Sequence, residues 1–408
     1  MCIRDRSHFI FDADRSYPRG GINPRPPLFS WCLALGGLAL HWLTGIAADD
    51  VVWWSVAGLP AIFGALIVLP VAGIANRMHS AQAGIIAAWL MALMPGHISH
   101  STFGLADHDS FALLFLTLAF YFWVRALAEI GSERVFRNPS PNPLYLVAGI
   151  REMWNRNPKM MSFATLAGIS FSTVALGWKG FVVGPSILFL AYALQVALNM
   201  FRRRDSTTLS VMFLVMLSIT FLMVLPFYGH PQFDLVFNST GLQPFLFIFG
   251  FTLAIAFVTT GFRDKPWLLV LGTLGALAAV FFAILYVLKT LDYSDAWDVL
   301  FTGSGYFTKT KIFGTVAEAN APNRAQLFAS FGPITFLLAL IMGGGLLWRG
   351  LRHRNGTALV FGVWVFAATF MAWNAARFMF NATPIMAVLL SLIHISEPTR
   401  QEAISYAV

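Results

Sequence analysis

Long apolar runs alternate with short polar segments along nearly the whole chain. A helix that crosses a bilayer needs roughly 17–25 predominantly apolar residues. We predict an all-α integral membrane protein with a span at each of eleven runs: 51–75, 81–98, 110–129, 162–177, 180–201, 208–228, 244–262, 266–290, 328–348, 356–374 and 377–393.

A further apolar helix is predicted at 29–48, and only a short segment with Asp49 and Asp50 separates it from the first span. If this helix crosses the membrane, the arginine-bearing residues 1–28 are cytoplasmic. If it lies along the outer surface, those residues are external. Hydrophobic periodicity leaves both arrangements open.

The composition agrees with a membrane protein and excludes other classes. Of the 408 residues, 57% are hydrophobic and 11% are charged, whereas soluble domains carry about 25% charged residues. Cys2 and Cys32 provide neither a disulfide framework nor a metal-ligand spacing. The net charge of +8 does not indicate nucleic-acid binding, because the basic residues lie in short loops between apolar runs.

These basic loops assign the two sides of the membrane. Cytoplasmic loops are rich in Lys and Arg, and the basic segments alternate so that one side receives Arg77, 130–161, 202–204, 263–265 and 349–354. The extracytoplasmic side then receives GLADHDS (104–110), GWKG (177–180), 229–243, 291–327 and NAAR (374–377). Most of the conspicuous acidic residues, including Asp107, Asp109 and Glu318, therefore face outward.

The segment GLADHDS places Asp107 and Asp109 between two spans. In an extended segment, two carboxylates at this spacing point to the same side. They can bind a hard divalent cation and leave room for water and phosphate ligands. The alternative is that Asp109 and Ser110 cap the helix that follows, which leaves Asp107 unexplained.

Two nearby histidines, His97 and His100, raise the possibility of a zinc or copper site. Their spacing near the end of a span equally suits ordinary interfacial histidines. We favour the interfacial interpretation.

Three more features of the outer side have two interpretations each. Glu318 lies in the loop 291–327, whose length is typical of functional or disordered loops, although a lone external glutamate is usually only solvated. Arg377 begins the last span and could bind phosphate bidentately, or reach lipid headgroups. Trp178 and Lys179 could likewise bind a phosphate ligand, or they could simply belong to the interfacial belt of aromatic residues that membrane proteins commonly have.

Four motifs in order, each on the expected side, resemble the catalytic subunit family of oligosaccharyltransferases. They are FDADRSYPRGGINPRPPLF at 11–29, GLADHDSF at 104–111, TVAE at 315–318 and ARF at 376–378. Their order and spacing are most similar to the single-subunit archaeal and bacterial enzymes, over nearly all of 8–393. The TVAE form and the single-chain pattern favour an archaeal host.

The resemblance implies a GT-C-type bundle of thirteen helices with large external loops, followed by a soluble external domain. The eleven predicted spans would be the second to the twelfth, within a transmembrane catalytic domain at 51–393. Residues 8–50 would belong to the first external loop, so the helix at 29–48 would not cross the membrane.

The resemblance also implies catalytic roles for Asp107, Asp109 and Glu318. Asp107 and Asp109 match the family's second acidic motif, whose acids bind Mn²⁺ or Mg²⁺; some archaeal relatives have His at the position of Asp109. Glu318 matches the glutamate that closes over the acceptor peptide and contacts the asparagine amide. Arg377 matches an arginine that holds the diphosphate of the lipid-linked donor.

The implied reaction is metal-dependent, inverting transfer of a glycan en bloc from a polyprenyl (di)phosphate to Asn in Asn-X-Ser/Thr. Trp178 and Lys179 lie in a turn near the family's donor site and match loosely as substrate-binding residues. The expected partners are the lipid-linked oligosaccharide, acceptor proteins and membrane lipids, with no nucleic acid. The expected location is the cell membrane, with the active site on its extracytoplasmic face.

Both ends of the chain resemble translated sequencing-adapter sequence, so residues 1–7 and 394–408 are excluded from fold prediction. The family's first acidic motif lies just upstream of the sequence that begins at His8, and the adapter-like start replaces it. The Trp-Trp-Asp-Tyr-Gly motif, the last span and the soluble domain are also expected to be missing.

Two other functions suit a multi-span protein. A secondary transporter would place charges near the bilayer midplane in broken helices, often in paired halves, whereas these acids lie at span ends on one side. Another polyprenyl-phosphosugar transferase, such as a protein mannosyltransferase or an arabinosyltransferase, also has acids in its first external loop. That class lacks a TVAE-type element in a late loop.

We predict that the isolated 408-residue chain transfers no glycan to an Asn-X-Thr peptide, because the motif that reads the sequon and the first acidic motif are absent from it. Mass spectrometry of the peptide after incubation with lipid-linked oligosaccharide and Mn²⁺ checks this, with a complete enzyme as positive control. Detectable glycopeptide would contradict the prediction.

Overall fold

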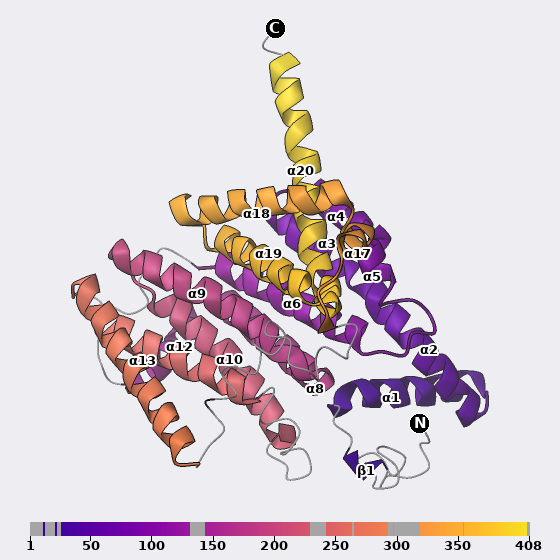
Figure 1. The fold of residues 1–408 in the computed structure, drawn as a ribbon, viewed down its shortest axis with the longest axis horizontal. Helices are drawn as coiled ribbons and strands as arrows, with labels where there is room; N and C mark the ends of the chain where they lie inside the picture. The colour runs from indigo at the N-terminus through magenta and orange to yellow at the C-terminus, as the bar shows by residue number, and fades with distance from the viewer. Residues whose placement is uncertain are drawn as a thin grey trace.

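A computed structural model of the chain describes residues 11–12, 21–22, 26–130, 143–228, 242–262, 265–292, 297, 319–353 and 355–405. Two short strands, β1 (Phe11–Asp12) and β2 (Gly21–Ile22), form an antiparallel pair. All other regular elements within these residues are helices (Figure 1). The all-α prediction is therefore confirmed.

The helices form a bundle in which α1 and α13 lie at opposite edges and α20 projects beyond the other helices at its C-terminal end (Figure 1). The first half contains α1 (Pro27–Thr44), α2 (Ala48–Leu66), α3 (Val68–Met78), α4 (Ala81–Leu93), α5 (Pro95–Ile98), α6 (Asp109–Ala128), α7 (Pro143–Arg156), α8 (Pro158–Gly177), η2 (Lys179–Val182) and α9 (Val183–Phe201). The second half contains α10 (Thr207–Tyr228), α12 (Gln243–Gly261), α13 (Trp267–Thr290), α17 (Arg324–Phe331), α18 (Pro333–His353), α19 (Gly356–Asn374), η6 (Ala376–Phe378) and α20 (Met379–Ser405).

Within the described residues, 11 helical segments are long and apolar enough to cross a membrane. This supports a multi-pass membrane protein, and the number equals the predicted number of spans. The two sets differ in one segment. Helix α1 is long enough to cross a membrane, whereas α4, with 13 residues, is not. Length and composition therefore leave open whether α1 crosses the membrane, and its external position stays a prediction.

Several predicted boundaries were wrong where proline or glycine interrupts a helix. The predicted span 81–98 divides at Met94, whose extended backbone precedes Pro95. The predicted span 328–348 divides into α17 and α18 at Gly332, which has a φ of +81° and is followed by Pro333. Only glycine adopts such a φ readily, so the apolar run continues while the helix stops.

The centre of the bundle consists of α6, α8 and α10, with α19 packed against α6 and α9. Phe120 of α6 stacks on Trp364 of α19 with 4.0 Å between ring centroids, and both rings are buried. By contrast, only 17% of the apolar window of α1 and 11% of that of α13 are buried within the protein. The stable core therefore lies in the central helices.

Where the structure describes them, parts of the predicted cytoplasmic and outer segments lie at opposite ends of these central helices. Arg202 donates a hydrogen bond of 2.6 Å to the carbonyl oxygen of Leu351, which joins two of the basic segments. Asn157, before α8, donates to the carbonyl oxygen of Glu129, after α6. Asp109 begins α6 at its other end, about 30 Å away for a 20-residue helix.

We predict that Gly168→Ala destabilises the bundle. A Cβ at Gly168 would lie 2.6 Å from the carbonyl oxygen of Met216, so α8 and α10 would have to separate. Overpacking of this kind costs about 1–3 kcal/mol, and thermal unfolding in detergent should show a lower midpoint. The matched control is Gly272→Ala in α13, where no described atom lies within 4 Å of the added Cβ. Equal midpoints for the two variants would contradict the prediction.

Candidate active site

The loop before α6 is held in place by a glycine. Gly104 has a φ of +91°, and its N–H donates to the carbonyl oxygen of Ala57 in α2 at 3.0 Å. A residue with a Cβ is strained at this φ. Two turns further along the same face of α2, Gly64 leaves space for Ser101, which would lie 2.3 Å from an added Cβ. The loop 99–108 is thus fixed against α2.

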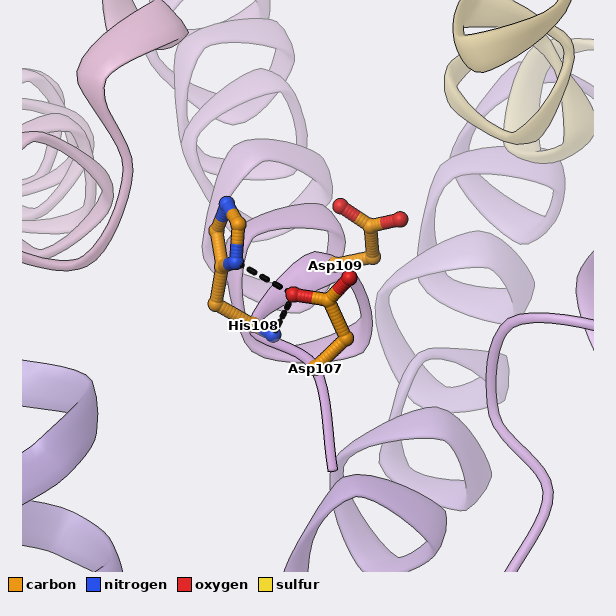
Figure 2. Close-up of side chains that lie close together, drawn as sticks. All are labelled: Asp107, His108 and Asp109. Carbon is orange, nitrogen blue, oxygen red and sulfur yellow. Dashed lines mark hydrogen bonds and ion pairs between the residues drawn. The ribbon is translucent and has the colours of Figure 1, made fainter. Parts of the chain in front are cut away.

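Asp107, His108 and Asp109 lie together where this loop enters α6 (Figure 2). Oδ1 of Asp107 accepts hydrogen bonds from the backbone N–H of His108 at 2.7 Å and from its ring Nδ1 at 2.5 Å. Figure 2 shows the carboxylate of Asp107 between the imidazole ring and the carboxylate of Asp109. One ligand atom from each of the three side chains lies within 4.8 Å of the others.

The capping interpretation of this segment was wrong. His108 occupies the N-cap position of α6, and no side chain among the described residues caps it. Asp109 is the first residue of the helix, so its carboxylate lies in the positive field of the helix N-terminus. The hydroxyl of Ser110 is buried without a hydrogen-bond partner in the described part of the chain.

The two upstream histidines, His97 and His100, have specific contacts within the protein. His97 is only 4% exposed, and its ring stacks on that of Phe380 with 6.1 Å between centroids. His100 is partly buried, and its Nδ1 lies 2.9 Å from Oδ2 of Asp109. Both histidines therefore contact other parts of the protein, and their position at the membrane interface stays a prediction.

Arg377 lies in η6, at the same end of the bundle as the acidic pair. The N–H of the preceding residue, Ala376, donates to the carbonyl oxygen of Asn320 at 2.9 Å. Ala319 is buried. Glu318 itself lies outside the described residues, so its predicted proximity to Asp107 and Asp109 stays a prediction. The chain that follows Glu318 nevertheless meets the turn that carries Arg377.

Trp178 and Lys179 occupy the turn between α8 and α9. The indole ring of Trp178 covers Gly180, where an added Cβ would lie 2.3 Å from the ring. The preceding Gly177 packs equally closely on Phe111, two residues after Asp109. This turn therefore lies at the same end of the bundle as the acidic pair.

The donor set at the start of α6 can hold a divalent cation. The hydrogen bonds described above use one oxygen of each carboxylate, Oδ1 of Asp107 and Oδ2 of Asp109. Carboxylate oxygen suits Mg²⁺ and Mn²⁺, and the imidazole nitrogen of His108 also suits Mn²⁺ or Zn²⁺. The residues present therefore fit the metal that the sequence predicts.

Comparison with known proteins identifies the family. Residues 6–395 match the family described as "Oligosaccharyl transferase STT3, N-terminal". The chain belongs to the oligosaccharyl transferase STT3 family. A curated relative, dolichyl-phosphooligosaccharide-protein glycotransferase 3 of Archaeoglobus fulgidus, is 24% identical over 94% of this chain and 43% of its own length. The chain thus spans less than half the length of that STT3 relative.

Solved structures of STT3-family proteins share the fold. The archaeal oligosaccharyltransferase AglB from Archaeoglobus fulgidus, in complex with an inhibitory peptide and a dolichol-phosphate, has a TM-score of 0.77 and 18% identity, and the match covers 98% of this chain and 46% of that chain. An A. fulgidus oligosaccharyltransferase in complex with zinc and sulfate has a TM-score of 0.68 and 19% identity, over 98% and 44% of the two chains. At this identity the likeness establishes the GT-C-type membrane fold.

We predict that Gly104→Ala alters the site, whereas Gly45→Ala does not. Both glycines have positive φ, +91° and +69°, so an alanine at either costs about 1–2 kcal/mol of folding stability. Gly45 ends α1, and no described atom lies within 4 Å of its added Cβ. Titration with Mn²⁺ should show weaker binding for Gly104→Ala alone. Equal Mn²⁺ affinities for the two variants would contradict the assignment of Gly104 to the site.

Proposed function

We propose that this chain is the membrane-embedded part of an oligosaccharyltransferase catalytic subunit. The complete enzyme would transfer a glycan en bloc, with inversion, from a polyprenyl (di)phosphate to Asn in Asn-X-Ser/Thr. The observation that carries the proposal is the placement of Asp107 and Asp109 at the same end of the bundle as the Arg377 turn. His100 and Phe380 connect these two elements through direct contacts.

Asp107 and Asp109 are the proposed ligands of Mn²⁺ or Mg²⁺, and His108 is close enough to contribute a third ligand atom. When bound, such an ion supplies positive charge that stabilises the departing phosphate oxygen. The A. fulgidus oligosaccharyltransferase in complex with zinc and sulfate supports the binding of a divalent cation by a protein of this fold. Asp107 and Asp109 keep their carboxylates close together before any ion arrives, because the loop is fixed at Gly104.

Arg377 and Lys179 are the proposed contacts of the phosphate groups of the lipid-linked donor. The planar guanidinium of Arg377 can contact two phosphate oxygens at once, whereas Lys179 supplies a compact charge. Trp178 offers an aromatic surface next to Lys179 in the sequence, and amphipathic rings of this kind are common where a protein meets lipid headgroups. The dolichol-phosphate bound to AglB of A. fulgidus supports a polyprenyl phosphate as donor.

Glu318 is the proposed contact of the acceptor asparagine. The amide nitrogen of asparagine is a poor nucleophile, because its lone pair is delocalised into the carbonyl group. A carboxylate that accepts hydrogen bonds from the amide N–H groups can twist the amide and reduce this delocalisation. No side chain of ordinary pKa ionises an amide, so the carboxylates act by positioning and electrostatics rather than as general bases.

The proposed location of the site is the extracytoplasmic face of the cell membrane. The basic segments that contain Arg202 and Leu351 meet at one end of the bundle. The acidic pair and Arg377 lie at the other end. This separation supports the positive-inside orientation.

We predict that the full-length gene product binds a sequon peptide only when a divalent cation is present, and that Glu318→Gln weakens this binding. Loss of a charged hydrogen bond costs about 1.5–3 kcal/mol, which corresponds to roughly a tenfold or greater rise in Kd. Fluorescence anisotropy of a labelled Asn-X-Thr peptide, with Mn²⁺ or with EDTA, measures the effect. The control is Glu129→Gln, at the opposite end of the bundle, which should bind like the unaltered protein.

Peptide binding that persists in EDTA, or equal affinity for the Glu318→Gln and Glu129→Gln proteins, would contradict the proposed acceptor site. Absence of both metal dependence and peptide binding would instead favour a transporter.

A further inference from the structure

His100 contacts two parts of the site with one ring. Its Nδ1 lies 2.9 Å from Oδ2 of Asp109. An ionised carboxylate can only accept hydrogen bonds, so the ring nitrogen donates. The face of the same ring stacks on Phe380, with 4.8 Å between centroids and an angle of 25° between the planes. His100 therefore joins the first residue of α6 to the first turn of α20.

Phe380 lies three residues after Arg377 and is 2% exposed. Its position is well defined, because His97 also stacks on it, with an angle of 4° between the planes. The helices around it pack closely: a Cβ at Gly96 of α5 would lie 3.2 Å from Ser330 of α17 and 3.4 Å from Thr383 of α20. Phe380 thus couples the turn that carries Arg377 to the loop before the acidic pair.

We propose that His100 is a positioning residue that fixes the carboxylate of Asp109 relative to the Arg377 turn. This inference rests on the proposed function, in which Asp109 binds the cation and Arg377 the donor phosphate. A hydrogen bond from His100 holds Oδ2 of Asp109 and limits rotation of that carboxylate, one ligand atom of which lies within 4.8 Å of ligand atoms of Asp107 and His108. Outer partners of this kind typically change metal affinity about 10–100-fold when they are removed.

Two substitutions separate the two contacts of His100. His100→Phe keeps an aromatic ring for Phe380 but removes the hydrogen-bond donor. His100→Asn keeps a donor near the position of Nδ1 but removes the ring. A residue with a merely structural role would respond mainly to loss of the stacked ring, whereas a positioning residue for Asp109 responds mainly to loss of the donor.

The experiment measures Mn²⁺ binding to the purified 408-residue chain in detergent, from the electron paramagnetic resonance signal of free Mn²⁺. We expect His100→Phe to raise the Kd for Mn²⁺ about tenfold, at the lower end of the range for such partners. We expect His100→Asn to restore most of that affinity. The control for a lost histidine is His79→Ala, since His79 is exposed between α3 and α4.

Phe380→Leu tests the second contact, because it preserves most of the buried volume but not the stacked ring. Because His100 keeps its donor to Asp109 in this variant, the Kd for Mn²⁺ should rise much less than for His100→Phe and stay close to that of Phe213→Leu, which removes a comparable buried stack on Tyr192. Thermal unfolding midpoints of all variants show whether each protein is folded at the temperature of the titration.

The outcomes distinguish this inference from the proposed function. If Asp107→Asn abolishes Mn²⁺ binding while His100→Phe leaves the Kd unchanged, the positioning role is overturned and the metal site stands. If His100→Asn binds as weakly as His100→Phe, the hydrogen bond to Asp109 is not what positions it, and the inference is again overturned. If Asp107→Asn and Asp109→Asn bind Mn²⁺ as the unaltered chain does, the proposed metal site fails, and with it the role of His100.

Discussion

The absence of water from the bilayer core is the constraint on which this structure depends. Each backbone N–H and C=O in hydrocarbon needs a partner within the protein, and a helix supplies those partners from its own backbone. The apolar segments therefore become helices regardless of the details of their sequence. Polar chemistry is confined to the places where helices start, end or break, and the acidic pair, the Trp178 turn and Arg377 all lie at such places.

The site is assembled from segments that are far apart in the sequence. Gly104 ties the acidic loop to α2, His100 ties α6 to α20, and Asn320 meets Ala376 beside Arg377. Each of these contacts is short in space, and the stack of His100 on Phe380 connects residues more than 250 positions apart. Glycines allow the segments around the site to pack closely. At Gly64, Gly96 and Gly177, neighbouring atoms occupy space that a Cβ would need.

The fold class could be predicted from the sequence because long apolar runs have few alternatives in a membrane. The charge, the spacing and the side of Asp107 and Asp109 left helix capping as an alternative, and it was the resemblance to the family that favoured a metal site, which stays a prediction. Glycine and proline effects were harder to predict: the break at Gly332 falls inside a continuous apolar run, and Pro95 interrupts a segment that reads as one span.

His100 was considered as a metal ligand and then interpreted as interfacial, because its partner, Asp109, is nine residues away across a loop, beyond the reach of any helical or strand periodicity. Nothing in the sequence distinguishes Phe380 from the other phenylalanines, since the chain contains 39 of them, most in apolar runs. Which of the apolar helices cross the membrane also could not be read from length alone. Helix α1 is long enough and α4 is short, although the resemblance to the family assigns them the opposite way.

The slight burial of α13 has a consequence for how this sequence can change. Only 11% of its most apolar window is buried inside the protein as the structure describes it, so few of its side chains pack against complementary protein surface there. Lipid chains rearrange around any apolar shape, whereas a packed core does not. Leucine, isoleucine, valine and phenylalanine are therefore nearly interchangeable over much of this helix. In α6, α8 and α10, by contrast, many apolar side chains are fully buried, so a change in their size or shape would disturb the packing.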